Sequence, residues 1–194
     1  LVFPTISDNS HRSTVQVSEV RLPSVYTDSS SAGLSFSGNL QVDAGATLQS
    51  AATLSASAIS GSGNLTIQHE GVGTIAGVVS DGASALSMDK RGAGTLTLSG
   101  VNTYTGTTTI DAGTLAIGGS GSLGSGSYSA NIINDGVFEY ASNADQLLSG
   151  VVSGSGSLSK TTAAGSRLSL VGNNTYSGGT SVTSGDLGLY RNTA

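Results

Sequence analysis

The sequence predicts an all-β protein, a right-handed single-stranded parallel β-helix, and three observations support this fold class. The first is composition, because the 194 residues include 29 Gly, no Cys and only 10% charged residues. The second is that apolar and polar residues alternate in short runs such as Leu96-Thr97-Leu98, while the i, i+3, i+4 spacing of an amphipathic helix is missing. The third is that one motif occurs twice, far apart in the chain. Repetition of short strands is typical of a solenoid.

Composition and charge argue against several classes of protein. The formal net charge is −5 and the seven basic residues do not cluster, so we expect no binding to a phosphate backbone and no nucleic acid partner. No apolar run approaches the roughly 18 to 20 residues of a membrane span. The lack of Cys fits export in an unfolded state through an oxidising compartment. The start at Leu1, with no charged and apolar leader, is typical of a processed or excised segment.

The repeat carries most of the information. Residues 92–118 and 165–190 align without a gap from Gly94 against Ser166 onward, and every matched pair is 72 positions apart. The matched pairs are Leu96 with Leu168, Leu98 with Leu170, Gly100 with Gly172, Asn102 with Asn174, Tyr104 with Tyr176, Gly106 with Gly178, Ile110 with Val182, Gly113 with Gly185 and Leu115 with Leu187. If 72 residues are a whole number of turns, they make three or four turns of about 18 to 24 residues, and the chain makes roughly eight to ten.

Alternation within the copies predicts where the core lies. In Leu96-Thr97-Leu98, Leu115-Ala116-Ile117 and Leu168-Ser169-Leu170, strand geometry sends both end residues to one face. So short a strand cannot bury this face alone, but turns stacked at about 4.8 Å align the aliphatic side chains in a continuous interior. The chain must also bend sharply at each corner, where glycine can take a positive φ. The glycines expected to do so are Gly106, Gly113, Gly136, Gly178 and Gly185.

Residues 1–32 differ from the β-helix that we expect over residues 33–194. They contain no Gly and hold both prolines, Pro4 and Pro23, beside strand-like apolar runs. An open end of a β-helix exposes unpaired N–H and C=O groups together with its apolar interior. Two interpretations therefore stay open for this segment: irregular strands that form an N-terminal cap, or the tail of a preceding functional domain.

The repeat also indicates a family. Residues 92–118 have the pattern GxGTLTLSGxNTYTGxTTIxAGTL, and residues 165–190 follow it with departures at Arg167 and Asp186. This pattern resembles the passenger-associated repeat of autotransporters, and the resemblance covers about residues 59–190. It implies a right-handed parallel β-helix that reaches the bacterial cell surface through the outer membrane. It also implies a C-terminal membrane barrel in the parent protein, which we do not expect within these 194 residues.

The polar residues that recur in both copies of the motif are interpreted as structural. Asn102 and Asn174, like Tyr104 and Tyr176, lie in Gly-bordered segments of the NTYTG or NTYSG type. A repeated Asn is typical of a turn residue or of a stacked amide. A ligand site seldom needs duplication in register, so we do not expect these residues to form a binding site.

Few residues could act as a base near neutral pH. The candidates are His11 and His69. His69 stands beside Glu70 just after the predicted strand at Leu65 to Ile67, so we expect it at an exposed corner. Because serine is abundant in this chain, a serine near either histidine carries little information about a catalytic triad.

Two short motifs are explained by their context. Gly119–Gly124 fits GxGxxG, but glycine and serine follow where a dinucleotide site needs a helix, so we expect a loop. Ser157–Lys160 fits SxxK, yet it falls in a recurrent strand instead of at a helix start. The twelve acidic residues are dispersed, and the calcium-binding repeat of β-rolls is missing. The sequence therefore predicts no catalytic residue, no cofactor-binding residue, no metal ligand and no cofactor.

The expected function is that of a non-catalytic scaffold of a secreted passenger region, which displays adhesive or effector parts at the bacterial surface and aids folding during secretion. Two alternatives stay open. The segment belongs to a surface enzyme or toxin of the protease or esterase type, either as its stem or as the bearer of a site built with residues 1–58, or it is a self-associating module for aggregation between cells. The expected partners are a host surface, identical rods on neighbouring cells and the membrane barrel of the parent protein.

Overall fold

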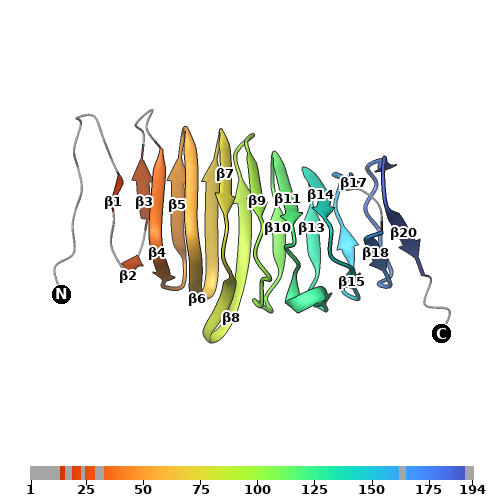
Figure 1. The fold of residues 1–194 in the computed structure, drawn as a ribbon, viewed down its shortest axis with the longest axis horizontal. Coiled ribbons are helices and arrows are strands. Elements are labelled where there is room, and N and C mark those ends of the chain that lie inside the picture. The colour runs from red at the N-terminus through yellow and green to blue at the C-terminus, as the bar shows by residue number, and fades with distance from the viewer. Residues whose placement is uncertain (1–13, 16–18, 23–24, 29–32, 162–164, 191–194) are drawn as a thin grey trace.

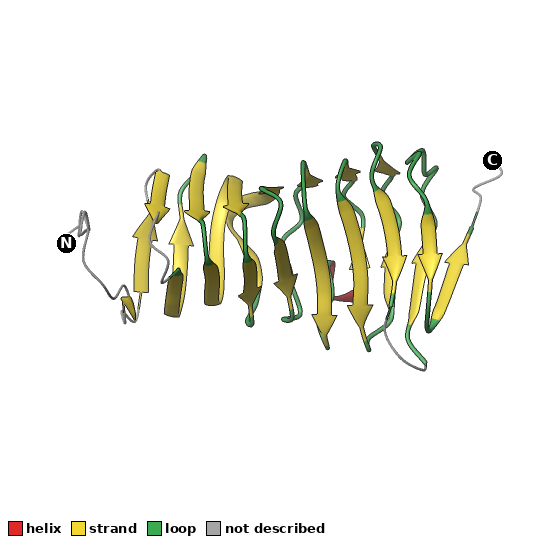
Figure 2. Cartoon of the chain, turned by 90° about the horizontal axis from the view of Figure 1, so that it is seen from above, coloured by secondary structure: helices red, strands yellow, loops and turns green. Residues whose placement is uncertain are grey.

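The protein is an elongated parallel β-solenoid of about eight turns in a computed structural model. The structure describes residues 14–15, 19–22, 25–28, 33–161 and 165–190. Strands follow one another along the rod in chain order, from β2 and β4 near one end to β18 and β20 near the other (Figure 1). The same stacking is visible from above (Figure 2). The predicted parallel β-helix is therefore confirmed.

Each turn passes three faces in a fixed order, which we name A, B and C. The strands of face A are β1 (Thr14–Val15), the first part of β4 (Leu34–Val42), the first part of β6 (Thr53–His69), β7 (Val72–Ile75), β9 (Thr95–Leu98), β11 (Thr114–Gly119), β14 (Val137–Ser142), β17 (Ser157–Lys160) and β19 (Thr180–Val182). The strands that lie only on face B are β2 (Glu19–Leu22), β12 (Ser127–Tyr128), β15 (Gln146–Leu148), β18 (Arg167–Leu170) and β20 (Asp186–Leu189).

Face C and the bent strands complete each turn. The strands of face C are β3 (Val25–Asp28), β5 (Ala46–Ser50), the last parts of β6 and β8 (Val79–Arg91), β10 (Thr108–Ile110), β13 (Ile132–Asn134) and β16 (Val152–Ser153). Strands β4, β6 and β8 are long because they continue around corners, and they therefore join faces that shorter strands keep separate. Among the described strands, paired residues of adjacent turns are between 19 positions apart, as for Thr95 and Thr114, and 24 positions apart, as for Thr108 and Ile132.

The interior consists of the alternate residues that the sequence pattern predicts. Leu96 and Leu98 of β9 are fully buried, and they pair in register with the fully buried Leu115 and Ile117 of β11. The residue between the leucines, Thr97, points outward and is only half-buried. Each buried aliphatic side chain thus packs on the equivalent side chain of the next turn, at the strand spacing of about 4.8 Å.

The two copies of the repeat do not lie over each other. On face A, the register places Leu96, Leu115, Phe138 and Leu158 in one column. Leu168 comes one strand later, on face B. The offset of 72 residues is therefore three turns plus one strand, so the condition of a whole number of turns is not met. All three faces use the same apolar-polar-apolar strand, so similarity in sequence does not determine the face.

The corner glycines act in two different ways. Gly113 and Gly185 have positive φ values of 67° and 75°, as predicted. The positive φ predicted for the other three is wrong, because Gly106, Gly136 and Gly178 do not adopt it. These glycines are needed for a close approach instead: a Cβ on Gly106 would lie 2.4 Å from the Leu86 carbonyl oxygen of the preceding turn. Ideal Cβ atoms on the other two would meet backbone oxygens at 2.5 and 2.2 Å.

The described pieces of residues 1–32 belong to the solenoid. Strands β1, β2 and β3 pair in parallel with β4 and β5 at offsets like those of the later turns. The rest of this segment, with both prolines and His11, lies outside the described residues, and both interpretations of residues 1–32, a cap or the tail of a preceding domain, stay predictions. In the described part of the chain, no helix is long and apolar enough to cross a membrane; the 3-10 helix η1 (Gly124–Gly126) is a single turn.

Candidate functional site

Asn102 holds three successive turns together. Its Oδ1 accepts a hydrogen bond of 2.9 Å from the N–H of Val79 in the preceding turn, and its Nδ2 donates one of 3.0 Å to the carbonyl of Ser122 in the next. The side chain is fully buried. In the second copy, Asn174 Oδ1 accepts an equivalent bond of 2.8 Å from Val152 N–H. The Asn of the motif is therefore structural, but it binds backbone and does not stack on a second amide.

The motif tyrosine bonds to a threonine four residues later. Tyr104 and Thr108 join their hydroxyls at 2.8 Å, and the hydroxyl of Tyr128 in the next turn extends the chain at 2.8 Å from Thr108. These three side chains are buried. In the second copy Tyr176 and Thr180 repeat the bond at 2.8 Å, in a more exposed setting. Burial raises the pKa of Tyr128 to about 12, so its hydroxyl serves as a neutral hydrogen-bonding group.

His69 is buried, and its prediction as an exposed corner residue is wrong. The exposed fraction of His69 is 0%. Its Nδ1 lies 3.3 Å from the carbonyl oxygen of Ser50, and its ring packs over Gly73, where a Cβ would lie 3.1 Å from the ring. The small Gly73 makes this inward orientation possible, because a larger residue would fill the space that the ring takes. Burial is the main cause that lowers the pKa of His69.

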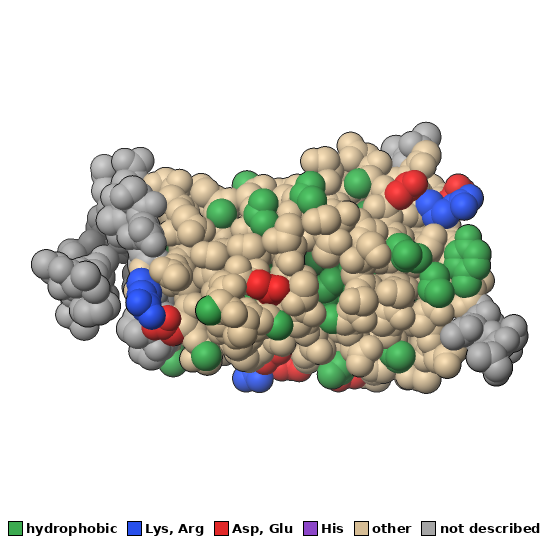
Figure 3. All heavy atoms as spheres, turned by 90° about the horizontal axis from the view of Figure 1, so that it is seen from below, with side chains coloured by type: hydrophobic (Ala, Val, Ile, Leu, Met, Phe, Trp, Pro, Cys, Tyr) green, Lys and Arg blue, Asp and Glu red, His purple; other side chains and the backbone are tan. Residues whose placement is uncertain are grey.

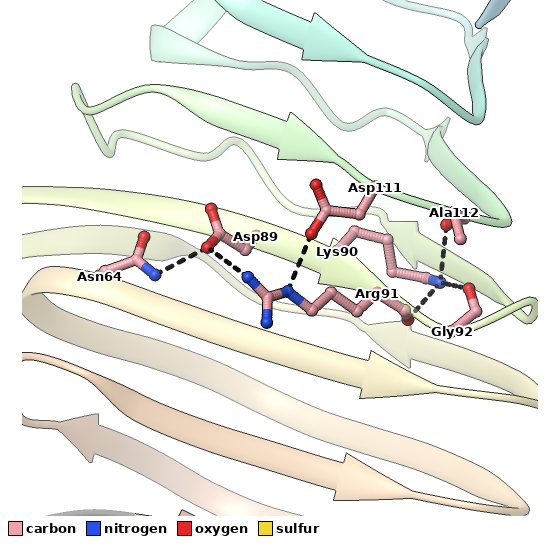
Figure 4. Close-up of polar contacts among 7 residues, drawn as sticks. All are labelled: Asn64, Asp89, Lys90, Arg91, Gly92, Asp111 and Ala112. Atoms are coloured by element: carbon pink, nitrogen blue, oxygen red, sulfur yellow. Dashed lines mark hydrogen bonds and ion pairs between the residues drawn. The ribbon is translucent and has the colours of Figure 1, made fainter.

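A fully buried lysine was missed by sequence reasoning. The Lys90 ammonium donates hydrogen bonds of 2.8 Å to the carbonyls of both Arg91 and Gly92, and a longer one of 3.4 Å to that of Ala112 in the next turn (Figure 4). Burial lowers the pKa of Lys90 to about 8, and the charge of Glu70 offsets part of this effect. The ammonium thus satisfies carbonyls at a corner where the regular pairing of β8 ends.

A second buried lysine precedes the second copy. Lys160 is fully buried and donates a 3.0 Å hydrogen bond to Ser166 Oγ, which in turn donates to the Ser142 carbonyl. Its ammonium also lies 5.5 Å from the centre of the Tyr140 ring, which is a cation–π distance. Burial lowers the pKa of Lys160 as well. The signal in the sequence that could have identified both buried lysines is a Lys followed by a short corner and then the next Leu. This signal is imperfect, because the corner after Lys160 is two residues longer than the corner after Lys90.

The outward side of β8, the strand that carries Lys90, bears ordinary surface charges. Arg91 lies 2.9 Å from Asp111 and 3.7 Å from Asp89, and Asn64 donates to Asp89 at 2.8 Å (Figure 4). Arg91 is exposed. Ion pairs of this kind contribute roughly 0 to 1 kcal/mol each, because water screens them. They connect turns but do not create an enclosed site.

The two motifs singled out in the sequence are parts of the solenoid. The expected loop of the GxGxxG motif lies between β11 and η1, and Gln146 of the next turn holds it: Leu123 N–H donates to the Gln146 amide oxygen at 2.7 Å. The SxxK segment forms strand β17, as expected, with its lysine inside the rod. Among the described residues, no group of three or more His, Asp or Glu could hold a metal ion.

Comparisons with known proteins agree with the repeat. The sequence model of one protein family, the passenger-associated transport repeat, matches residues 88–117 and 165–189. The chain is 40% identical to the adhesin BmaC autotransporter of Brucella suis biovar 1 (strain 1330) over 97 residues, which are 50% of this chain and 2% of the Brucella protein. No solved structure matches the chain significantly.

The first family match begins at Met88, two residues before Lys90, and both matches include the Asn and Tyr of the motif. Asn102 and Lys90, which bind the backbone of adjacent turns, thus lie within the first match. The resemblance predicted from the sequence is confirmed: the chain carries two passenger-associated transport repeats and is similar to the passenger regions of autotransporters.

Proposed function

We propose that this segment is a non-catalytic, elongated scaffold in a secreted autotransporter passenger, and that it displays adhesive or effector parts of the parent protein at the bacterial cell surface. The observation that carries the proposal is that each repeat copy closes one full turn. Leu96 pairs with Leu115 within the first copy, and Leu168 pairs with Leu187 within the second. One copy therefore contains a complete stacking contact between turns, which is what a unit that extends a rod must supply.

The same contact supports a role in folding during secretion. Each turn binds the edge of the turn before it, as when the Asn102 side chain binds the backbone N–H of Val79. A folded turn outside the cell offers an open strand edge to the segment that follows, so folding proceeds from neighbour to neighbour. Such growth would oppose backward sliding through the membrane barrel of the parent protein, which we propose as the partner in export.

The polar groups that could have served chemistry are engaged in structure, and this supports a non-catalytic role. Asn102, Tyr104 and Lys90 bind backbone or neighbouring side chains in the interior. The Brucella relative is named an adhesin, and this chain spans only 2% of its length. We therefore assign adhesion to the parent protein as a whole, and the rod to the display of its adhesive parts.

The proposed outer partners are a host surface or identical rods on neighbouring cells. On the face of the molecule in Figure 3, charged side chains are few and hydrophobic side chains are scattered, and the rest of the described surface is backbone and uncharged side chains of other types. Outward residues of face A include Ser55, Thr74 and Thr97, which lie in register on successive turns. Such hydroxyl-bearing rows suit weak, additive contacts. Sedimentation of the purified chain at high concentration tests pairing of rods, and a single monomeric species throughout would remove that partner.

Export of the parent protein tests the scaffold role. Leu96→Asp and Leu168→Asp place a charge in the fully buried interior of each copy, where an unpaired charge is costly. The matched controls Thr97→Asp and Ser169→Asp change the adjacent outward residues. We expect the interior variants to lose surface delivery and protease resistance while the controls keep both. Normal delivery and resistance of both interior variants would refute the proposal.

A further inference from the structure

Two buried basic residues share one corner of the rod. We call residues 69–73 and 90–94 the His69–Lys90 corner, because these segments connect face C to face A in two successive turns. Gly94 N–H donates a 3.0 Å hydrogen bond to the carbonyl of His69, and a Cβ on Gly92 would lie 2.5 Å from that same oxygen. Lys90 in turn binds the carbonyl of Gly92. The two segments are therefore in direct contact, with both basic side chains inside.

The His69 ring is enclosed but incompletely hydrogen-bonded. The carbonyl of Ser50 lies 3.3 Å from Nδ1, while the buried Nε2 has no hydrogen-bond partner. In the neutral ring, Nδ1–H can donate to Ser50 and Nε2 keeps a lone pair that water does not reach. Hydrogen bonding to the backbone of Ser50 and Val72 favours the charged ring, but burial in the space beside Gly73 outweighs it.

Few charges face the ring. Strand β5 supplies the neutral Ser50, strand β7 supplies Val72 and Gly73, and strand β8 supplies Lys90. Glu70, next in the chain, is the acidic group that acts on the ring, but it is exposed and its Oε2 accepts a hydrogen bond from Ala93 N–H at 2.9 Å. The buried Lys90 opposes a positive charge on the ring, and the solvent-exposed Glu70 compensates only weakly.

We propose that the His69–Lys90 corner is an acid-sensitive latch, in which uptake of a proton by His69 places a second cation beside Lys90 and opens this corner of the rod. The change is local, since each turn of a solenoid contacts only its neighbours. Opening releases the contact between residues 69–73 and 90–94 and exposes the interior of these turns. The stability of this part of the rod therefore depends on the pH of its surroundings.

The direction of the effect follows from proton linkage. In the unfolded chain His69 takes up its proton near its ordinary pKa of 6.5, whereas in the folded chain burial lowers that pKa. The unfolded state therefore binds more protons as the pH falls below 6.5, and the folded state loses stability in this range. One proton corresponds to at most a tenfold shift of the folding equilibrium per pH unit.

Unfolding by urea between pH 5 and 7.5 tests the latch in the 194-residue chain. We expect the folding constant of the wild type to fall below pH 6.5 by up to about tenfold per unit, and the His69→Gln variant to show a flatter dependence. The matched control, His11→Gln, removes the other histidine and should behave like the wild type. An unchanged pH dependence in His69→Gln, or a flattened one only in His11→Gln, would overturn the proposal.

A direct titration covers the case in which His69→Gln fails to fold. In the His11→Gln variant one imidazole remains, and NMR follows its protonation while hydrogen exchange followed by mass spectrometry reports opening of residues 69–94. We expect the ring to gain its proton at a pH below 6.5, together with faster exchange at this corner. The Lys90→Met change should raise the pKa of the ring. Protonation at an ordinary pKa with unchanged exchange would contradict the latch.

Discussion

Leu96 and Leu168 are equivalent residues of the two repeat copies, yet they lie in different sheets of the rod. Leu96 pairs with Leu115 on face A, and Leu168 pairs with Leu187 on face B. The second copy is therefore displaced around the axis by one face as well as along it. A copy begins on face A in one case and on face B in the other, and each brings the same corner contacts, from the Asn that binds the preceding turn to the Tyr–Thr pair.

If the faces are equivalent, core substitutions on two of them should cost similar amounts. Leu98→Ala and Leu170→Ala each truncate a fully buried side chain and should lower the free energy of unfolding by about 2 to 5 kcal/mol. The outward Thr97→Ala and Ser169→Ala should change it by about 0.5 kcal/mol or less. Urea unfolding measures all four. A large cost on one face and none on the other would contradict the equivalence.

The Asn of the motif should matter more in the first copy than in the second. Asn102→Ala leaves the buried N–H of Val79 without its acceptor and should cost about 2 to 4 kcal/mol, since an unsatisfied buried group is expensive. Asn174 is only half-buried, so water can replace part of its bond to Val152, and Asn174→Ala should cost about 1 kcal/mol. Thermal and urea unfolding of the two variants provide the comparison. Equal losses of stability in the two variants would mean that burial does not determine how much this hydrogen bond contributes to the free energy of unfolding.

Stability should rise with pH above pH 8 because of Lys90. Its folded pKa is lowered from 10.5 to about 8, so between these values the unfolded chain holds a proton that the folded chain has released. Below pH 8 both states are charged and the cost of burying the ammonium is present in full. The gain is on the order of 2 kcal/mol and should be absent in Lys90→Met.

Unfolding should be measured from pH 7.5 to 9.5 for this purpose. Above pH 10 the raised pKa values of Tyr104 and Tyr128 act in the opposite direction, because the unfolded tyrosines lose their protons first and the folded state becomes less favoured. A wild-type profile that is flat or falls over this range, or one that Lys90→Met leaves unchanged, would contradict the assignment of the buried ammonium.

Close packing of corners predicts that Gly106 does not tolerate a methyl group. In Gly106→Ala the new Cβ would lie 2.4 Å from the Leu86 carbonyl oxygen, so the two turns must separate locally. The loss of stability should be about 1 to 3 kcal/mol. Gly179→Ala is the matched control, because no atom lies within 4 Å of its Cβ position and its φ is not positive. Unfolding midpoints that respond equally to both changes would rule out close approach as the reason for Gly106.

The sequence predicts the class of fold well because alternation has a direct geometric meaning. A run such as Leu96-Thr97-Leu98 sends two leucines to one side, and many such runs in one chain need a common interior. Which face a strand joins is not encoded in that pattern, because hydrogen-bond register between turns decides it. The offset of 72 residues exceeds three turns by one strand, and the repeat alone does not reveal this because the number of residues per turn varies.

The buried polar groups lie beyond what the pattern reveals. Lys90 looks like a surface residue in the sequence because lysine is seldom fully buried. It enters the rod because the carbonyls of Arg91 and Gly92 are already placed around the ammonium by the turn of the chain. His69 is similar, since the space for its ring comes from Gly73 in the following strand. Both depend on neighbours brought close by the fold.

Disulfide mapping tests the stacking of turns most directly, and the absence of native Cys makes it clean. Glu139 pairs in register with Ser159 on face A, and a spacing of about 4.8 Å between paired strands suits a disulfide. Cysteines at 139 and 159 should form a bridge without loss of stability, whereas cysteines at 139 and 169 should not, because Ser169 lies on face B. A bridge between 139 and 169, with none between 139 and 159, would contradict the parallel solenoid and its placement of the two repeats.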